Sequence, residues 1–407
     1  MNSEKEHFSC IAVDMGAGSI RVMLGRLSKE VLSLKEIHRF SNEIQVREGI
    51  DTWDMDRIAR EIQTGISMAI EASDQVPGSI GVDSWGVDYV RLDAHGELVE
   101  TPVAYRDKRT EGMQDKWRTR MSDSETFSRT GINSYVFNTL YQLLSAEDSH
   151  ALRRSSHLLF VPCYINFLLS GVAVNELTIA STSQILQVDG GDWDPDILEK
   201  LDLEAGKLGN VVSPGTRLGP VRLEEFSEIA MENVAVCGHD TACVVAALPV
   251  QDPNFAFISA GTWCIVGLEA DRPLISEEAR LLGITNERSY GNSYRPLKNI
   301  VGLWLLQGLK KEFSDDISFA QMEAMIRDER DISQVIDPDD PQFYNPGSMK
   351  KAFMTYFEKT GQPIPPAISD YIRCAYDSLC FSFRYYVEEL EKLSGKSLEV
   401  LHLVGGG

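Results

Sequence analysis

Residues 10–24 read CIAVDMGAGSIRVML, which is an apolar strand, a turn of small residues and an apolar return strand. Residues 255–269 repeat this design as FAFISAGTWCIVGLE, again with a small turn that contains Gly. Two short apolar runs joined by such a turn predict a β-hairpin. Because each hairpin opens a long stretch of mixed strand and helix patterns, we expect two halves of similar α/β architecture that face one cleft.

Further strands and helices are predicted around these hairpins. The run VLSLKEIHRF (31–40) should extend the first hairpin into an antiparallel meander. In residues 54–72, isoleucines recur on one helical face, and Asp54 can cap the helix N-terminus. The apolar part of residues 294–307 indicates a buried helix. The other expected elements are strands at 79–83 and 398–404, a hairpin over 89–100, loops over 188–220, and helices at 138–148, 163–170, 316–330 and 366–394.

The composition limits the class of partner. The chain has 407 residues, enough for two or three domains, and its 61 acidic and 39 basic side chains give a formal net charge of −22. Nucleic acids and anionic membranes select basic faces, so neither is expected as a partner. A phosphate ligand must therefore be held locally, by backbone N–H groups, a metal ion or a few placed side chains.

Cysteine usage and hydropathy indicate the compartment. The seven cysteines are odd in number and form no CxxC pair, which favours reduced thiols in a cytosol. The opening residues MNSEKEHFSC are too polar for a signal peptide. The longest apolar stretches are shorter than the roughly 20 residues that a membrane-spanning helix needs. We therefore expect a cytoplasmic protein.

The two small turns are candidate phosphate-binding sites. In the first, Asp14 ends the strand and the run GAGS (16–19) forms the turn. Backbone N–H groups of such a turn can point at one phosphate, and an acid at the strand end can hold Mg²⁺, usually through water. The second turn, SAGT (259–262), could grip the same nucleotide from the opposite side. Each turn alone is equally consistent with an ordinary Gly-rich hairpin.

The run GHDT (238–241) lies between a predicted strand and a predicted helix start. Asp240 can serve there as a helix cap. It can also accept a hydroxyl proton during phosphoryl transfer, which depends mostly on positioning and charge neutralisation. The two roles are compatible, because a cap at a helix N-terminus is also a cleft residue. His239 could bond a sugar hydroxyl, although a lone histidine is more often structural.

Two further segments suit a sugar. The run DSWGVD (83–88) places a tryptophan and two acids at the end of a buried strand, so that the ring can cover C–H groups while carboxylates take hydroxyls. A strand end with a core tryptophan explains the same pattern. In YRPLKNIVGLWLLQ (294–307), the amides of Asn299 and Gln307 lie in an apolar context and need partners, which the backbone can also supply. The sequence contains no Walker loop, nucleophile elbow or GxGxxG string.

Taken together and in this order, the segments resemble the FGGY carbohydrate kinases. The resemblance rests on DSWGVD, AYRD, GHDTA, SAGTW, KNIVGLWLLQ and VGGG, and it runs from about residue 8 to the last residue. It implies an actin-like (ribonuclease H-like) α/β fold whose two domains, 1–248 and 249–407, close over a cleft. It also implies a phosphotransferase that uses ATP and Mg²⁺ on a ketose: L-rhamnulose at its C1 hydroxyl, with L-fuculose and xylulose as alternatives.

The resemblance also implies roles for single residues. Asp240 matches the catalytic base, and Asp14 matches the acid that orients Mg²⁺. The residues implied to line the sugar are Gly86, His239, Asp240, Thr241 and Asn299. Those implied to serve ATP are Ala17, Gly18, Ser19, Ile20, Arg21, Thr262, Gln307 and Gly406.

Two features depart from the family's pattern. The first turn usually reads Gly-Ala-Ser-Ser-Gly-Arg, whereas here Ile20 stands where a glycine is expected; if that position needs φ > 0, the turn must adjust. Family members also continue past the Gly triplet 405–407 with a helix that packs on adenine. We therefore expect an incomplete second domain, an exposed apolar edge beside residues 398–404 and weak ATP binding. A sugar-binding protein with little turnover and a slow ATPase are the alternatives.

Overall fold

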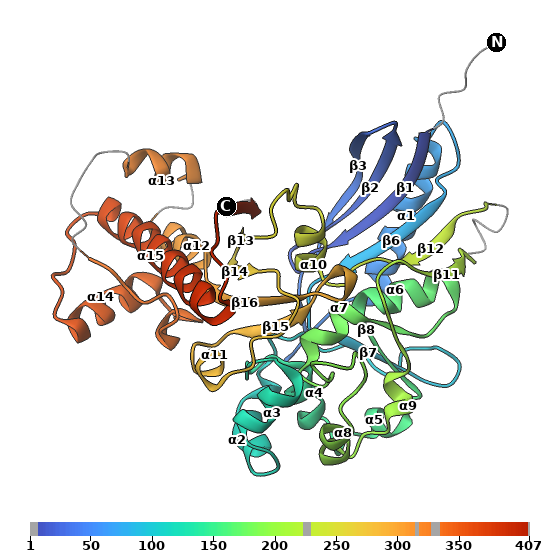
Figure 1. Ribbon diagram of the computed structural model, residues 1–407, viewed down its shortest axis with the longest axis horizontal. Helices are drawn as coiled ribbons and strands as arrows, with labels where there is room; N and C mark the ends of the chain where they lie inside the picture. Colours follow the sequence, from blue (N-terminus) through green and yellow to red (C-terminus); the bar gives the residue numbers. More distant parts are fainter. Residues whose placement is uncertain (1–6, 223–228, 314–316, 327–333, 406–407) are drawn as a thin grey trace. The chain divides into compact units, whose positions relative to one another are not determined.

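The computed structural model describes residues 7–222, 229–313, 317–326 and 334–405, and the chain divides into two compact units (Figure 1). The first unit contains two segments from beyond residue 248, the end of the predicted first domain. Its parts are Met1–Ala247, Asp271–Arg280 and Asn286–Tyr294, and those of the second unit are Leu248–Ala270, Leu281–Thr285 and Arg295–Gly407. The predicted division at residue 248 stays a prediction.

A six-stranded sheet forms the centre of the first unit, in the order β11-β12-β6-β1-β2-β3, with β11 at Thr216–Pro220 and β12 at Glu232–Ala235. The predicted antiparallel meander is confirmed as β1 (His7–Met15), β2 (Ser19–Ser28) and β3 (Val31–Ser41). Strand β6 (Ser79–Ser84) runs parallel to β1 on its other side. Helix α6 (Val161–Ser170) packs against β6 and β12.

Helix α1 (Met55–Glu71) packs against β2 and β3 and confirms the predicted pattern. The Asp54 carboxylate caps it by accepting a hydrogen bond from the Arg57 backbone N at 3.0 Å. Ile58, Ile62 and Ile66 are almost fully buried against the sheet, and Ile70, on the same face, is half-buried. A Cβ added at Gly65 would lie 2.5 Å from Cγ2 of Val22, so glycine is what allows the helix to approach β2 this closely.

The second unit is built on a five-stranded sheet in the order β15-β16-β14-β13-β17, with β15 at Thr285–Arg288 and β16 at Tyr294–Val301. Its hairpin is β13 (Phe255–Ala260) and β14 (Trp263–Leu268), and β17 (Val400–Gly405) runs parallel to β13. A parallel neighbour, two hairpin strands and a third antiparallel strand thus follow in the same order as β6, β1, β2 and β3. The predicted likeness of the two halves is confirmed at the level of sheet topology.

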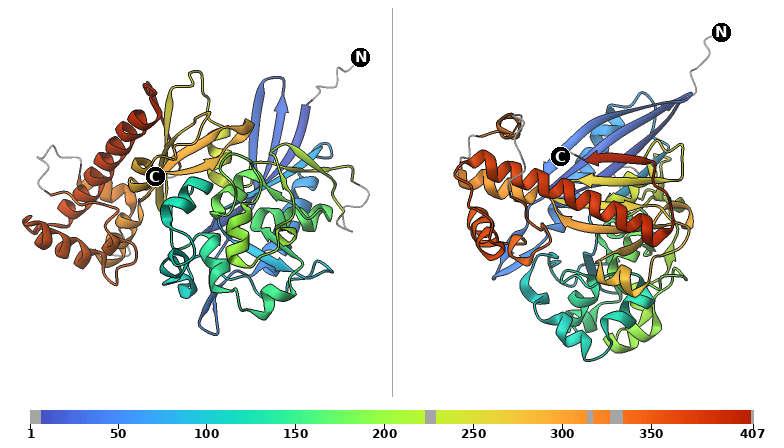
Figure 2. Two further views of the ribbon diagram at one scale, coloured as in Figure 1. Left: turned by 60° about the horizontal axis from the view of Figure 1, so that its bottom comes forward. Right: turned by 60° about the vertical axis from the view of Figure 1, so that its left-hand side comes forward.

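Strand β17 lies at the edge of this sheet and leaves Leu401 and Leu403 more than half exposed. The predicted exposed apolar edge is therefore present. Helix α15 (Ile368–Ser394) packs against β14 and against α12 (Trp304–Phe313), as Figure 2 shows for the red helix. Tyr371 of α15 makes an edge-to-face contact with Phe353 of α14 (Met349–Thr360), and both rings are buried.

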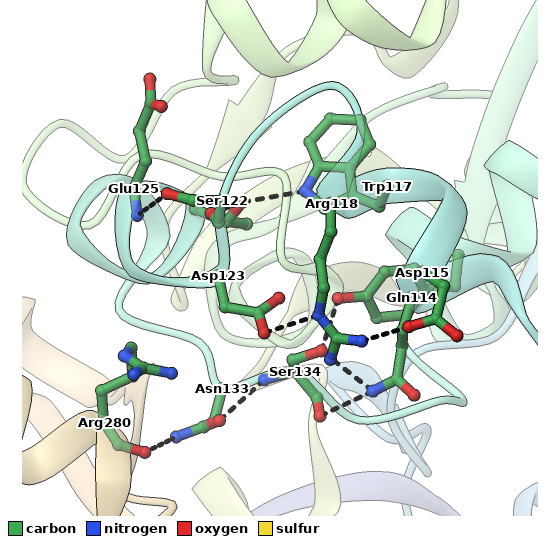
Figure 3. Close-up of polar contacts among 12 residues, drawn as sticks. Gln114, Asp115, Trp117, Arg118, Ser122, Asp123, Glu125, Asn133, Ser134 and Arg280 are labelled. Carbon is green, nitrogen blue, oxygen red and sulfur yellow. Dashed lines mark hydrogen bonds and ion pairs between the residues drawn. The ribbon is translucent and has the colours of Figure 1, made fainter.

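Hydrogen bonds join the segments Asp271–Arg280 and Asn286–Tyr294 to the rest of the first unit. Asn133 donates from Nδ2 to the carbonyl of Arg280 at 2.7 Å, and its Oδ1 accepts from the backbone N of Ser134 (Figure 3). Asn286 donates to the carbonyl of Gly131 at 3.0 Å. These contacts place residues of the later sequence beside the first unit's helices, so the order of the chain alone does not define that unit.

The remaining elements lie between these landmarks. In the first unit they are β4 (Gln45–Arg47), β5 (Ile50–Thr52), β7 (Tyr89–Leu92), η1 (Lys108–Thr110), α2 (Met113–Arg118), α3 (Asp123–Thr130), α4 (Thr139–Ser145), α5 (His150–Arg154), β8 (His157–Phe160), β9 (Asn175–Glu176), α7 (Leu177–Ala180), η2 (Ser181–Ser183), α8 (Pro195–Leu201), α9 (Ala205–Leu208), β10 (Val211–Val212), β11 (Thr216–Pro220), β12 (Glu232–Ala235), α10 (Asp240–Ala246) and η4 (Tyr290–Asn292). The others are α11 (Glu277–Leu281), β15 (Thr285–Arg288), β16 (Tyr294–Val301), α13 (Phe319–Met325) and η5 (Pro341–Phe343).

Three sequence predictions are corrected. The helix predicted in the apolar part of residues 294–307 forms only from Trp304, as the start of α12, whereas residues 294–301 form strand β16, because backbone pairing with β14 decides the state of a short apolar run. The hairpin over 89–100 keeps its predicted turn, but β7 pairs mainly with β8. Residues 188–220 contain helices α8 and α9 as well as loops. Of the helix predicted over 316–330, α13 forms and residues 327–330 lie outside the described part.

The thiols agree with the predicted reduced state. Within the described residues, none of the seven cysteines forms a disulfide, and four of them are buried. Burial raises the pKa of the Cys163 thiol well above its usual range. Within the described residues, no helix is both long enough and apolar enough to cross a membrane.

Candidate active site

Three carboxylates gather where strands of the first sheet end. Asp14 of β1 and Asp83 of β6 are register partners on parallel neighbouring strands. Burial, and then the nearby charges of Asp14 and Asp240, raise the pKa of Asp83 well above its usual range. Burial also raises the pKa of Asp14, which Arg21 opposes and Asp240 reinforces. This concentration of negative charge favours a cation or a proton at the strand ends.

Asp240 begins helix α10 and is held by the next residue. Its Oδ1 accepts from the backbone N of Thr241 at 2.6 Å and from the Thr241 hydroxyl at 3.1 Å. The Asp240 side chain is still 40% exposed, so its other oxygen is open to a ligand. Thr241, which is also implied to line the sugar, is itself buried, and its hydroxyl donates to Asp240.

His239 is fixed from two sides. Its Nδ1 lies 2.9 Å from Oε2 of Glu287, and its Nε2 lies 3.4 Å from Oδ1 of Asp240. Both His239 and Glu287 are buried. A Cβ added at Gly86 would lie 3.3 Å from Nε2 of His239, so a side chain there would crowd the imidazole. Three of the residues implied to line a sugar, Gly86, His239 and Asp240, are thus neighbours.

The loop after β6 is held in an unfavourable backbone conformation. Val87 has φ = 66°, a region that β-branched residues rarely adopt. Its N–H donates to the Thr182 hydroxyl at 3.1 Å, and its carbonyl accepts from the Thr139 hydroxyl at 2.7 Å and from Gln142 at 3.2 Å. Strain of this kind persists only where the surroundings determine it, and it is concentrated at functional sites. The three hydrogen bonds to Val87 therefore also hold the neighbouring Gly86 in place.

Asp88 anchors the same loop from inside the core. Its Oδ2 accepts from Nε1 of Trp53 at 2.6 Å, from Nε1 of Trp85 at 2.9 Å and from the backbone N of Tyr105 at 3.2 Å. Burial raises the pKa of Asp88 to about 6, against these hydrogen bonds, which lower it. Trp85 is therefore a core residue bound to Asp88, and its ring is not an open platform for a sugar.

The raised pKa of Asp88 predicts a pH dependence of stability. The folded protein binds this proton below about pH 6 and the unfolded chain only near 3.8, so the group stabilises the fold as pH falls through this window. Relative to Asp88→Asn, the free energy of unfolding of the unmodified protein should rise by about 2 kcal/mol between roughly pH 7.5 and 4.5. Urea unfolding of both proteins at the two pH values measures this difference. A constant difference would contradict the assignment.

The first turn leaves room for a phosphate at its tip. A Cβ added at Gly18 would meet nothing within 4 Å, and Ala17 and Ser19 are half-buried beside it. Ile20 belongs to β2 with its side chain fully buried in the core, and it is not among the residues with positive φ. The glycine expected at this position is thus not needed for the backbone, and only the main chain of Ile20 can face a ligand.

Arg21 links this turn to the acids. Its Nη1 donates to Oδ2 of Asp14 at 3.4 Å, and both side chains are 41% exposed. Its buried Nε has no hydrogen-bond partner among the described residues. A buried donor without a partner is unfavourable, and a phosphate oxygen would satisfy it. Arg21 therefore fits the predicted role towards ATP.

The second turn brings together two of the residues implied to serve ATP. Nε2 of Gln307 donates to the Thr262 hydroxyl at 3.3 Å. Leu303 N donates to the carbonyl of Gly261 at 3.0 Å, so the start of α12 is bonded directly to the turn. Asn299 lies on β16 opposite Ile265 and is half-buried. Gly406 lies outside the described residues.

The donor set fits Mg²⁺ bound mainly by phosphates. Among the residues that the structure describes, no three histidine, cysteine or acidic side chains are grouped to hold a metal ion. Mg²⁺ commonly keeps several waters and uses one or two carboxylates together with substrate phosphates. The half-exposed carboxylate of Asp14, beside an open phosphate turn, matches this mode.

Sequence reasoning did not find two buried acids beside the GHDT run. Glu287 contacts His239, and Glu176 accepts a hydrogen bond from the backbone N of Gly238 at 2.7 Å. Glu176 stands in the otherwise mostly apolar stretch VAVNELTIA, and that isolated charge was the available signal. For Glu287 the signal is weaker, because NERSY reads as an ordinary polar segment.

Comparison with known proteins identifies the family. The model of the FGGY family of carbohydrate kinases, N-terminal domain, matches residues 9–248, and that of the C-terminal domain matches residues 256–407. A rhamnulokinase of Pectobacterium carotovorum is 40% identical over 98% of this chain and 80% of its own length. A rhamnulokinase of Bacillus subtilis is 35% identical over 97% of this chain and 82% of its own length.

Solved structures show the same fold at low identity. The gluconate kinase and the xylulose kinase of Lactobacillus acidophilus both superpose with a TM-score of 0.79 at 15% identity, over 98% of this chain and 82% and 81% of theirs. The predicted two-domain sugar kinase fold is confirmed. With both family models matching in sequence order, the chain belongs to the FGGY family of carbohydrate kinases.

Proposed function

We propose that this protein is an ATP-dependent ketose kinase that phosphorylates the C1 hydroxyl of L-rhamnulose. The observation that carries the proposal is the half-exposed Asp240 carboxylate at the start of α10, with His239 on one side and the acids Asp14 and Asp83 nearby. A fixed carboxylate beside a phosphate turn is the arrangement that phosphoryl transfer to an alcohol needs.

Residues of the first unit are proposed to have different roles in the reaction. Asp240 accepts the proton of the C1 hydroxyl while the new O–P bond forms and the bond between the γ-phosphorus and the β–γ bridging oxygen breaks, which releases ADP. Its second oxygen is held by Thr241, so the accepting oxygen keeps one orientation. His239, which contacts Glu287, is proposed to bond another sugar hydroxyl. Such positioning supplies most of the rate enhancement in this reaction class.

ATP and Mg²⁺ supply the transferable phosphoryl group and the positive charge that neutralises it. We propose that the main chain of residues 17–20 and the Arg21 guanidinium bind phosphate oxygens, and that Asp14 orients the metal ion through water. In the second unit, Thr262 and Gln307, which already bond each other, bind the nucleotide together with Gly406. Asn299 is proposed to bond the sugar.

The choice of L-rhamnulose is supported by the curated relatives. Rhamnulokinases of several bacterial genera, including Bacteroides thetaiotaomicron at 37% identity over 99% of this chain, match both sequence halves. A cytoplasmic location is proposed because the seven cysteines, four of them buried, form no disulfide within the described residues. Ketoses that differ by one methyl group or one epimeric centre are separated by only about 1–3 kcal/mol in a pocket, so the sugar needs direct testing.

A coupled ADP-release assay over L-rhamnulose, L-fuculose and xylulose tests the proposal. We expect the highest kcat/KM for L-rhamnulose, with a 1-phosphate product identified by ³¹P NMR. A higher value for another ketose would reassign the substrate within the same family. ADP release that does not depend on sugar would indicate an ATPase. Calorimetric sugar binding without ADP release would indicate a binding protein.

A further inference from the structure

A buried glutamate collects four hydrogen bonds on one oxygen. Glu176 is 2% exposed. Its Oε2 accepts from the backbone N of Thr178 at 2.9 Å, from the Thr178 hydroxyl at 2.7 Å, from the backbone N of Ile179 at 3.1 Å and from the backbone N of Gly238 at 2.7 Å. Its Oε1 is buried without a hydrogen-bond partner among the described residues.

Capping of α7 explains only part of this arrangement. The bonds from Thr178 and Ile179 are those of an N-cap, which a shorter Asp or Ser would make equally well. The bond from Gly238 comes from a residue 62 positions later, immediately before His239 and Asp240. A longer side chain is needed for one oxygen to serve both segments, so the second contact distinguishes Glu176 from an ordinary cap.

The same network holds the next residue as well. The backbone N of His239 donates to the Thr178 hydroxyl at 3.2 Å, and that hydroxyl donates in turn to Glu176. On the other side, the carbonyl of Gly238 accepts from the backbone N of Ser84 at 2.9 Å. Both polar groups of the Gly238 backbone are therefore bonded inside the protein, and the segment that leads into Asp240 has little freedom.

Glycine is required at position 238 because the acid lies so close. An added Cβ would lie 2.8 Å from Oε2 of Glu176 and 3.0 Å from Cγ2 of Ile179. Burial raises the pKa of Glu176, while its hydrogen bonds lower it. Bonds between N–H groups and a carboxylate are about twice as strong as neutral ones, which suits an acid that must fix a backbone against desolvation.

We propose that Glu176 is a positioning residue for the proposed phosphoryl transfer: it fixes the backbone of Gly238 and, through Thr178, of His239, and so sets the place of the Asp240 carboxylate. The inference rests on the proposed function for its kinetic consequence. Its structural consequence, a firmly bonded Gly238 amide, can be measured independently of any substrate.

Glu176→Gln tests the proposal with nearly unchanged shape. The amide oxygen is a weaker acceptor, and the amide nitrogen would be left without an acceptor or would face the Gly238 N–H. We expect kcat for the ketose to fall by about tenfold, as for a small displacement of a catalytic group, with the KM for ATP within about twofold. Hydrogen exchange at the Gly238 and His239 amides should become faster.

Matched variants separate positioning from general stability. Asp194→Asn makes the same carboxylate-to-amide change at another buried helix cap, that of α8, where the acid accepts from Asp196 N and Ile197 N at 3.0 Å and also pairs with Arg129, so this control perturbs its surroundings at least as much. It should leave kcat and exchange at Gly238 unchanged. Thr178→Val should reproduce the effect of Glu176→Gln in weaker form, and Thr178→Ser, which keeps the hydroxyl, should restore it.

The outcomes distinguish this inference from the proposed function. Unchanged kcat and unchanged exchange in Glu176→Gln would overturn the positioning role, as would an equal loss of kcat in Asp194→Asn. If the unmodified protein shows no ketose-dependent ADP release, the proposed function fails, whereas the exchange of the Gly238 amide still decides whether Glu176 holds this segment.

Discussion

Replacing Asp240 with asparagine should lower kcat for ketose phosphorylation by at least about a hundredfold, the usual scale of general acid–base assistance. The amide cannot accept the C1 proton. It can still accept the hydrogen bonds that Thr241 donates, so the loop should keep its conformation. Sugar affinity should therefore change little. Steady-state ADP release and calorimetry with the ketose alone measure the two effects separately.

A matched control is available in another helix. Asp56 also lies in the first turn of a helix, α1, where it is exposed and distant in sequence from the GHDT run. Asp56→Asn should leave kcat unchanged. Full activity of Asp240→Asn would show that Asp240 is not the catalytic base, and Asp83 and Asp14 would then be the carboxylates to test.

Replacing Gly302 with alanine should damage the second phosphate turn. An added Cβ would lie 2.4 Å from Sγ of Cys264, 2.7 Å from the Cys264 backbone N and 2.8 Å from the carbonyl of Gly261. Two of these atoms belong to the backbone, the Gly261 carbonyl in the turn and the Cys264 N in β14, so the backbone must shift. Overpacking of this kind typically lowers the free energy of unfolding by about 1–3 kcal/mol. We also expect the KM for ATP to rise by about tenfold, since Thr262 moves with the turn.

The control for this prediction is a glycine in open space. A Cβ added at Gly347 would meet nothing within 4 Å, and no positive φ is recorded there. Gly347→Ala should preserve both urea stability and the KM for ATP. An unaltered KM for ATP in Gly302→Ala, at lowered stability, would show that the second turn packs the fold without binding nucleotide.

The sequence predicted correctly those elements whose signals lie within one short segment. The two hairpins combine alternating apolar residues with a small turn, and α1 combines an Asp cap with a clear helical period, so each signal is complete within one segment. Residues 294–301 carried no such signal. A short run containing Leu, Ile and Val suits either a helix or a buried strand, and pairing with β14 settles its state through contacts that the segment itself does not encode.

The same distinction applies to the site. Asp14 and the GHDT run stand at strand ends, where sequence alone indicates a cleft, and the structure brings Asp14, Asp83 and Asp240 within electrostatic reach of one another. Glu176 contacts Gly238, and Glu287 contacts His239, each from a distant part of the chain. No spacing rule could have joined them, because their proximity is a property of the assembled fold.

The repeated sheet order carries a consequence for charge. Strands β1 and β13 occupy equivalent places, and the register that pairs Asp14 with Asp83 pairs Ser259 with Val404 in the other half. One copy of the scaffold is thus anionic at its strand ends, and the other is uncharged at the matching positions. The repeated topology is therefore electrically asymmetric: the half with Asp14 and Asp83 favours a cation or a proton at its strand ends, and the other half presents no such charge to an anionic ligand.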